Sequence, residues 1–133
     1  MGILGYKQAR SPDIKATTKK VGDAAEDAAC EFLLDQGMRL ITRNYRTPGR
    51  GGGEIDIIAT AADGTLVFVE VRKRGSASHG GAAASVGFAK QRRIIFAARH
   101  YLLHLQTVPP CRFDVIAIEP HGVEWLQAAF DAS

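Results

Sequence analysis

Two short apolar segments of the 133-residue chain each carry a pair of charged residues at alternating positions. Glu54 and Asp56 alternate with isoleucines in EIDIIAT, and Glu70 and Arg72 alternate with valines in LVFVEVR. Residues i and i+2 of a β-strand point to the same face, so the members of each pair share a face. The Asp-Gly turn signal at 63–64 predicts that the two strands pair antiparallel, which would bring the acids and the cation together.

Carboxylates that converge in this way are the oxygen ligands that a hard divalent cation requires. Mg²⁺ is commonly held by one or two protein carboxylates together with the phosphate of a substrate. A metal ion beside a phosphodiester lowers the pKa of the attacking water and stabilises the leaving oxygen. Asp56 and Glu70 are therefore candidate ligands for Mg²⁺ or Mn²⁺. The alternative is a salt bridge of Arg72 with Glu70 or Asp56 on an exposed sheet face.

The basic residues are segregated from the acidic ones along the chain, although the net charge is only +3. Residues 71–113 contain eight Lys and Arg and no Asp or Glu, whereas residues 114–133 contain four acids and no Lys or Arg. Clustered cations without acids favour contact with a phosphate backbone. The alternative is a solvated surface whose charge partners come from elsewhere in the fold. The candidate phosphate contacts are Arg74, Lys90, Arg92 and Arg93.

The elements that must position these residues follow from the hydrophobic periodicity. Their order, helix-strand-strand-strand-helix-strand-strand, predicts an α/β domain with a mixed central sheet flanked by helices. We expect residues 1–20 to form a flexible basic arm and residues 21–133 to form one domain. The predicted helices cover 21–36 and 88–105, and the predicted strands cover 38–46, 54–60, 66–72, 113–118 and 123–126.

The apolar residues that alternate with the charged ones should face the core. This expectation places Ile55, Ile57, Val69 and Val71 together on the face opposite the acids. Charged residues interrupt every apolar run well before the ~20 residues that a membrane span requires. The two cysteines lie far apart and form no CxxC motif, which fits a reducing cytoplasm.

Several longer segments resemble the YraN-like family of small bacterial proteins, which are uncharacterised predicted endonucleases. The matching strings, in chain order, are GDAAEDAACEFLLDQGMRLITRNYR, GGGEIDIIA, LVFVEVRKR, KQRRIIFAARHYL and CRFDVIAI. Together they cover nearly the whole chain from about residue 21 to residue 130. The resemblance implies a restriction-endonuclease-like core of the PD-(D/E)xK superfamily, similar to that of Holliday-junction resolvases.

The resemblance also assigns roles to individual residues. Asp56 looks like the metal-binding aspartate, Glu70 looks like the acid of the (D/E)xK motif, and Arg72 stands at its lysine position. Glu26 resembles the first-helix acid that completes the metal site in this group. Gln91 resembles the glutamine that supports the site in resolvase-type members.

The arginine at the lysine position of the motif limits the chemistry that this residue can perform. A guanidinium is always charged and cannot act as a base, so Arg72 could only stabilise the phosphate or position the nucleophile.

Our leading hypothesis is a metal-dependent endonuclease that acts on DNA, with branched or damaged structures as substrates. The alternatives are a non-catalytic nucleic-acid-binding protein on the same fold and a protein-interaction module that uses its acidic C-terminal segment. A homodimer also remains open, because related resolvases dimerise.

Overall fold

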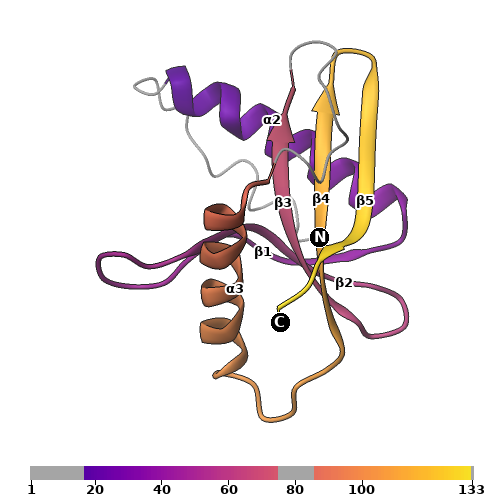
Figure 1. The fold of residues 1–133 in the computed structure, drawn as a ribbon. Helices are drawn as coiled ribbons and strands as arrows, with labels where there is room; N and C mark the ends of the chain where they lie inside the picture. The colour runs from indigo at the N-terminus through magenta and orange to yellow at the C-terminus, as the bar shows by residue number, and fades with distance from the viewer. Residues whose placement is uncertain (1–16, 75–85, 133) are drawn as a thin grey trace, which may run out of the picture.

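The computed structural model describes residues 17–74 and 86–132, with the side chains of residues 17–23 excepted. Two helices and five strands follow one another in the predicted order (Figure 1). Most of the predicted N-terminal arm and most of the glycine-, alanine- and serine-rich segment 75–87 lie outside the described residues. None of the described helices is long and apolar enough to cross a membrane. The elements are α2 (Thr17–Asp35), β1 (Arg39–Arg46), β2 (Glu54–Thr60), β3 (Leu66–Lys73), α3 (Phe88–Leu102), β4 (Cys111–Glu119) and β5 (Gly122–Phe130).

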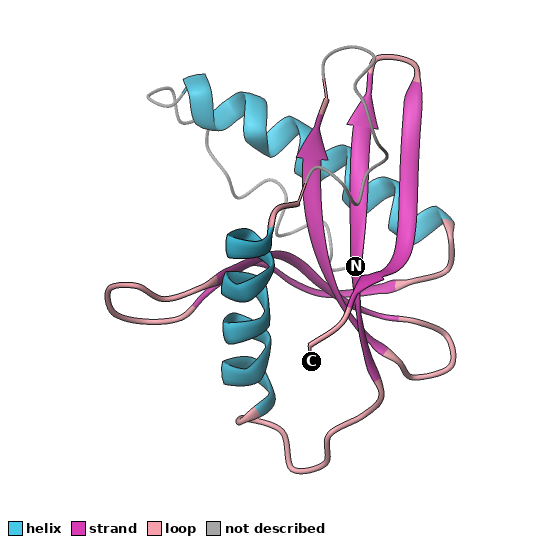
Figure 2. Ribbon diagram, in the orientation of Figure 1, coloured by secondary structure: helices cyan, strands magenta, loops and turns pink. Residues whose placement is uncertain are grey.

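The five strands form one mixed sheet in the order β1-β2-β3-β4-β5. Only β3 and β4 pair parallel, and the chain between them includes α3. The other neighbours pair antiparallel. The structure thus confirms the predicted α/β class, with a mixed sheet flanked by two helices (Figure 2). The last strand is longer than predicted because pairing with β4 continues to Phe130, past a positive φ of 52° at Ala128.

Each face of the sheet carries its own hydrophobic core, one beneath each helix. The α3-side core includes Ile55, Ile58, Phe68, Ile94 and Ala98. The α2-side core includes Ala29, Leu33, Ile57, Val67 and Val69, with Val71 packed against it. The prediction that Ile55 and Ile57 face the same core is therefore wrong. The regular alternation of β2 breaks at the residue between them, Asp56.

The sheet splits between β2 and β3 at this residue. The paired positions run from Thr60 with Leu66 to Ile57 with Val69. Beyond Ile57, the Asp56 Oδ2 atom accepts a hydrogen bond of 2.8 Å from the Val71 backbone N–H. The end of β2 stays paired with β1, and the end of β3 stays paired with β4. The two halves of the sheet therefore separate at the point where the charged residues of both strands lie.

Candidate metal centre and its basic surroundings

Glu70 is a nearly buried carboxylate at the split in the sheet, with 3% of its surface exposed. Its Oε2 atom lies 3.3 Å from Arg72 Nη1 and 3.7 Å from Lys90 Nζ. Its Oε1 atom is buried and has no hydrogen-bond partner within the described part of the chain. A buried carboxyl oxygen without a partner is costly, so it indicates either strain or a place for a ligand.

A second buried carboxylate shows what a purely structural acid looks like in this fold. Asp114 is completely buried, and all of its contacts are hydrogen bonds of 2.9 to 3.2 Å. The donors are Arg112 Nε, Trp125 Nε1 and the Ala128 backbone N–H. Because these donors satisfy both of its oxygens, Asp114 needs no further ligand. Glu70 differs, because it has two longer ion pairs and its Oε1 atom accepts no hydrogen bond from an N–H or O–H group in the described residues.

The carboxyl groups of Asp56 and Glu70 are close enough to act on one another. Burial raises the pKa of Glu70 to about 8, and the negative charge of Asp56 and a side-chain hydrogen bond with Asp56 add to this rise. The ammonium of Lys90 and the guanidinium of Arg72 lower the Glu70 pKa, but less strongly. Glu70 therefore gives up its proton reluctantly beside the Asp56 carboxylate, and a bound divalent cation would favour its ionised form.

Glu26 approaches the same place from α2. Burial and the charge of Asp56 raise the pKa of Glu26, so Asp56 lies within electrostatic reach of both other acids. The Oε1 atom of Glu26 pairs with Arg43 Nη2 at 3.3 Å, and Arg43 also holds Asp27 at 2.8 Å. The sequence prediction missed Arg43, which neutralises Glu26 from β1. Among the residues that the structure describes, no group of three acids, histidines or cysteines is arranged to hold a metal ion.

The donor set at the split fits a hard divalent cation. Asp56 and Glu70 supply two adjacent carboxylates, and Glu70 Oε1 is a buried oxygen to which no described residue donates a hydrogen bond. Mg²⁺ needs no more than this from the protein, because water and substrate phosphate complete its octahedral shell. Mn²⁺ accepts the same oxygen ligands. Glu26 lies near this pair, with its charge balanced by Arg43.

Lys90 lies closer to the acids than the sequence suggested. Its ammonium group bridges Glu54 Oε2 at 3.6 Å and Glu70 Oε2 at 3.7 Å, from the first turn of α3. Glu54 is also paired with Arg46 at 3.5 Å. Arg72 and Lys90 thus place two cations beside Glu70, one from its own strand and one from the helix above it. No sequence signal identifies Lys90 as the second, because it depends on how α3 packs.

The remaining predicted residues are spread around this centre. The Gln91 side chain donates a hydrogen bond of 3.0 Å to the Val86 carbonyl oxygen, so its amide contacts the start of α3 and not a carboxylate. Arg74 is mostly buried and lies 3.8 Å from Glu119. Arg92 and Arg93 are exposed on α3, and neither forms a salt bridge with an acid in residues 17–74 or 86–132.

Comparison with known proteins gives one consistent result. Residues 25–118 match the model of an uncharacterised protein family, UPF0102. A UPF0102 protein of Albidiferax ferrireducens is 64% identical over 124 residues, covering 91% of this chain and 97% of its own length. Another from Paracidovorax citrulli is 60% identical over 134 aligned positions, covering 99% of both chains. A third, from an Acidovorax strain, is 56% identical over the full length of both. The family that the sequence resemblance indicated is thereby confirmed, and the chain belongs to the UPF0102 family.

Proposed function

We propose that this protein is a metal-dependent endonuclease that hydrolyses phosphodiester bonds of DNA, with branched or damaged structures as its substrates. The observation that carries this proposal is the carboxylate pair of Asp56 and Glu70 at the split in the sheet. One oxygen of this pair, Glu70 Oε1, is buried and has no hydrogen-bond donor among residues 17–74 and 86–132, and the pKa of Glu70 is raised to about 8. Perturbed acids beside exposed cations are typical of functional sites.

In this proposal Asp56 and Glu70 hold Mg²⁺ or Mn²⁺, and Glu26 assists from α2. When bound, the metal ion would lower the pKa of the attacking water and neutralise the scissile phosphate. The hydrogen bond from the Val71 N–H to Asp56 Oδ2 holds that carboxylate in place. The packing around Glu70 does the same for its side chain, since rigid ligands keep a catalytic geometry without reorganisation.

The two cations beside Glu70 have complementary positions. Arg72 is partly exposed, so its guanidinium can turn from Glu70 towards a phosphate oxygen at the entrance of the site. Lys90 is held between Glu54 and Glu70 and supports the acids from the α3 side. Both cations would stabilise the negative charge that builds up on the phosphate in the transition state. Gln91 braces the start of α3 through Val86, which keeps Lys90 above the site.

The DNA backbone would lie along the exposed face of α3, a helix that contains no Asp or Glu. Arg92 and Arg93 are exposed there without salt-bridge partners in the described ranges. Arg74 is mostly buried beside Glu119 and would have to turn outward to join them. These contacts carry no sequence information, so binding should depend on shape and salt and not on base identity. We place the protein in the cytoplasm, where a reducing environment keeps thiols such as Cys30 and Cys111 free.

The test is cleavage of labelled duplex, single-stranded and four-way junction DNA in Mg²⁺ or Mn²⁺. Asp56→Asn and Glu70→Gln should each reduce cleavage at least about 100-fold, because each removes a charged metal ligand. Glu124→Gln serves as the control, since Glu124 is exposed on β5, which β4 separates from β3. Cleavage that survives both substitutions in a folded protein would refute the site.

A second function is favoured by one contact, the 3.3 Å pair between Arg72 and Glu70. An arginine that neutralises the motif acid suits a non-catalytic nucleic-acid-binding protein on the same fold. That protein would bind DNA in a salt-dependent way and would not cleave it in any divalent metal. Arg72→Lys separates the two functions, because a gain of cleavage identifies a weakened nuclease.

A further inference from the structure

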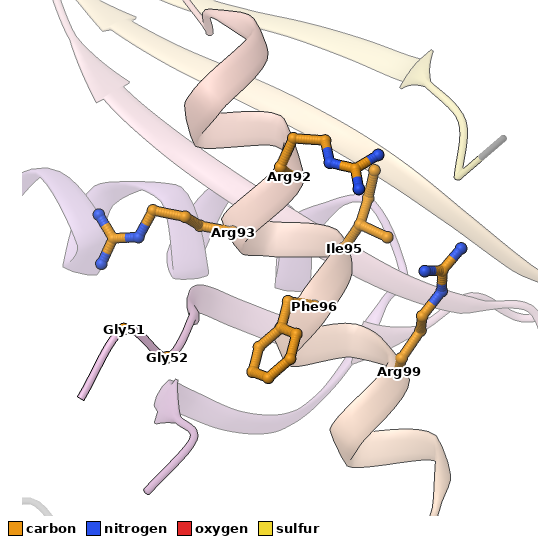
Figure 3. A pocket seen from close by; sticks show the side chains of 7 residues that line it. All are labelled: Gly51, Gly52, Arg92, Arg93, Ile95, Phe96 and Arg99. Carbon is orange, nitrogen blue, oxygen red and sulfur yellow. The ribbon is translucent and has the colours of Figure 1, made fainter. Parts of the chain in front are cut away.

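A basic pocket lies beside the carboxylate centre, on the outer side of α3. Its volume is about 270 Å³, and its lining combines three arginines, one phenylalanine and backbone of the glycine-rich β1–β2 loop (Figure 3). The residues that matter here are Arg92, Arg93, Phe96, Arg99, Gly51 and Gly52. The predicted phosphate contacts included two of these arginines and gave no role to Phe96 or Arg99.

The wall of this pocket is built into the fold. The β1–β2 loop is closed by the Thr47 N–H, which donates to the Gly53 carbonyl oxygen at 3.1 Å. The Gly53 N–H donates in turn to Thr47 Oγ1 at 2.8 Å. A Cβ atom on Gly53 would collide with the carbonyl oxygen of Arg93, so only glycine allows the loop to pack this closely on α3.

The pocket is continuous with the surroundings of the candidate metal centre. A neighbouring hollow of about 370 Å³ shares Gly51, Gly52 and Arg93 with it and extends to Glu54. Glu54 is bridged to Glu70 by Lys90, with both distances below 4 Å. A DNA strand that is bound at the carboxylate pair could therefore continue along this surface into the pocket.

The charge of the pocket selects an anionic ligand. None of its three arginines forms a salt bridge with an acid in the described part of the chain. Arg99 donates a hydrogen bond of 3.2 Å to the Ala132 carbonyl oxygen, which leaves its positive charge uncompensated. Guanidinium groups without acidic partners are suited to phosphate, which each can bind through two parallel hydrogen bonds.

Exposed aromatic rings accompany these cations. The Phe96 side chain is 54% exposed and Phe88, two turns earlier, is 74% exposed. The guanidinium of Arg92 lies 5.7 Å from the centre of the Phe88 ring. Phenyl rings interleaved with cations bind unpaired nucleotides, because the bases stack on the rings while the cations hold the backbone. Bases within a duplex are already stacked and cannot use such a ring.

Electrostatics argue against a second copy of this chain as the occupant. Two such pockets in contact would bring the arginines of both copies together, and none of the residues that line the pocket is an acid that could neutralise them. A polyanion has the complementary charge.

We propose that this pocket binds a single-stranded segment of DNA, with a base stacked on Phe96 and the adjoining phosphates on Arg92, Arg93 and Arg99. This inference rests on the proposed function, since it takes DNA as the substrate. It adds the reason for a preference for branched DNA: the enzyme holds the unpaired flank in the pocket while the carboxylate pair faces the adjoining phosphodiester.

The test is a binding titration in EDTA with a labelled oligo(dT) and with a labelled duplex of equal length. Fluorescence anisotropy reports the fraction bound. Phe96→Ala should weaken binding of the single strand about 5- to 150-fold, because one stacked base is lost. Duplex affinity should stay unchanged, and Phe96→Trp should retain single-strand binding. Arg92→Ala and Arg93→Ala should each lower the salt slope by about 0.7, the value per phosphate contact of a single strand. Leu103→Ala is the control, because Leu103 is exposed at the other end of α3.

The outcomes separate this inference from the proposed nuclease function, because binding in EDTA requires no cleavage. A Phe96-dependent single-strand affinity supports the pocket even if no variant cleaves DNA. Equal losses for single strand and duplex, or no loss for either, overturn it even if the enzyme cleaves. A dimer in sedimentation analysis that Phe96→Ala converts to a monomer, with unchanged single-strand affinity, would assign the face to a second copy. Tighter binding of oligo(U) than of oligo(dU) would replace DNA by RNA as the ligand.

Discussion

Replacing Glu70 by glutamine should stabilise the folded protein at alkaline pH. The substitution keeps the shape of the side chain and removes its charge. In the folded chain, burial and then the charge of Asp56 raise the Glu70 pKa from 4.5 to about 8. Between these two values the folded state binds a proton that the unfolded state has lost, so the stability of the wild type falls as pH rises.

The size of this effect follows from the same two values. Each pH unit between 4.5 and about 8 costs the folded state about 1.4 kcal/mol. The loss is absent at pH 4 and complete above pH 8, where it reaches about 5 kcal/mol. Glutamine has no charge to bury, so Glu70→Gln should match the wild type at pH 4 and exceed its stability by several kcal/mol at pH 9.

Urea denaturation at several pH values measures this difference. A chain of this size has an m-value of about 1–3 kcal/mol per M, so the midpoints should differ by roughly 2 M at pH 9 and converge at pH 4. Glu124→Gln, an exposed substitution on β5, should follow the wild type throughout. Parallel pH curves for the wild type and Glu70→Gln would refute the reasoning.

Magnesium should offset the loss of stability that the wild type shows at alkaline pH. At pH 8 a bound divalent cation favours the ionised carboxylate pair, and at 100 times its Kd it stabilises the folded state by about 2.7 kcal/mol. Glu70→Gln should lose most of this gain because a charged ligand is missing. Equal stabilisation of both proteins, or of neither, would contradict a metal site at Asp56 and Glu70.

Three further predictions concern the neighbouring residues. Asp114→Asn should destabilise the protein by about 3–5 kcal/mol in urea denaturation, opposite in sign to Glu70→Gln, because it breaks a satisfied buried ion pair. Gly53→Ala should lower stability by about 1–3 kcal/mol through collision with the α3 backbone. Lys90→Met should shift the rising limb of the pH–rate profile for DNA cleavage to higher pH, because Lys90 lowers the Glu70 pKa; an unshifted profile would contradict the contact.

Local patterns in the sequence determined a large part of this protein. The alternation in β2 and β3 reveals Glu54, Asp56, Glu70 and Arg72 as strand residues, and periodicity yields the order of the helices and strands. Such patterns arise because strands and helices repeat every two and 3.6 residues, so a short window is enough to detect them. The order of the matching strings also identified the family.

The tertiary structure decided which side chains meet. The split between β2 and β3 moved Ile55 and Ile57 into different cores, although both stand at alternating positions. The packing of α3 placed Lys90 on Glu70 and turned Gln91 towards the Val86 carbonyl. Contacts of this kind join residues far apart in the chain, and no periodicity encodes them. They are set by where strands stop pairing and by how closely a helix can approach, as the contact at Gly53 illustrates.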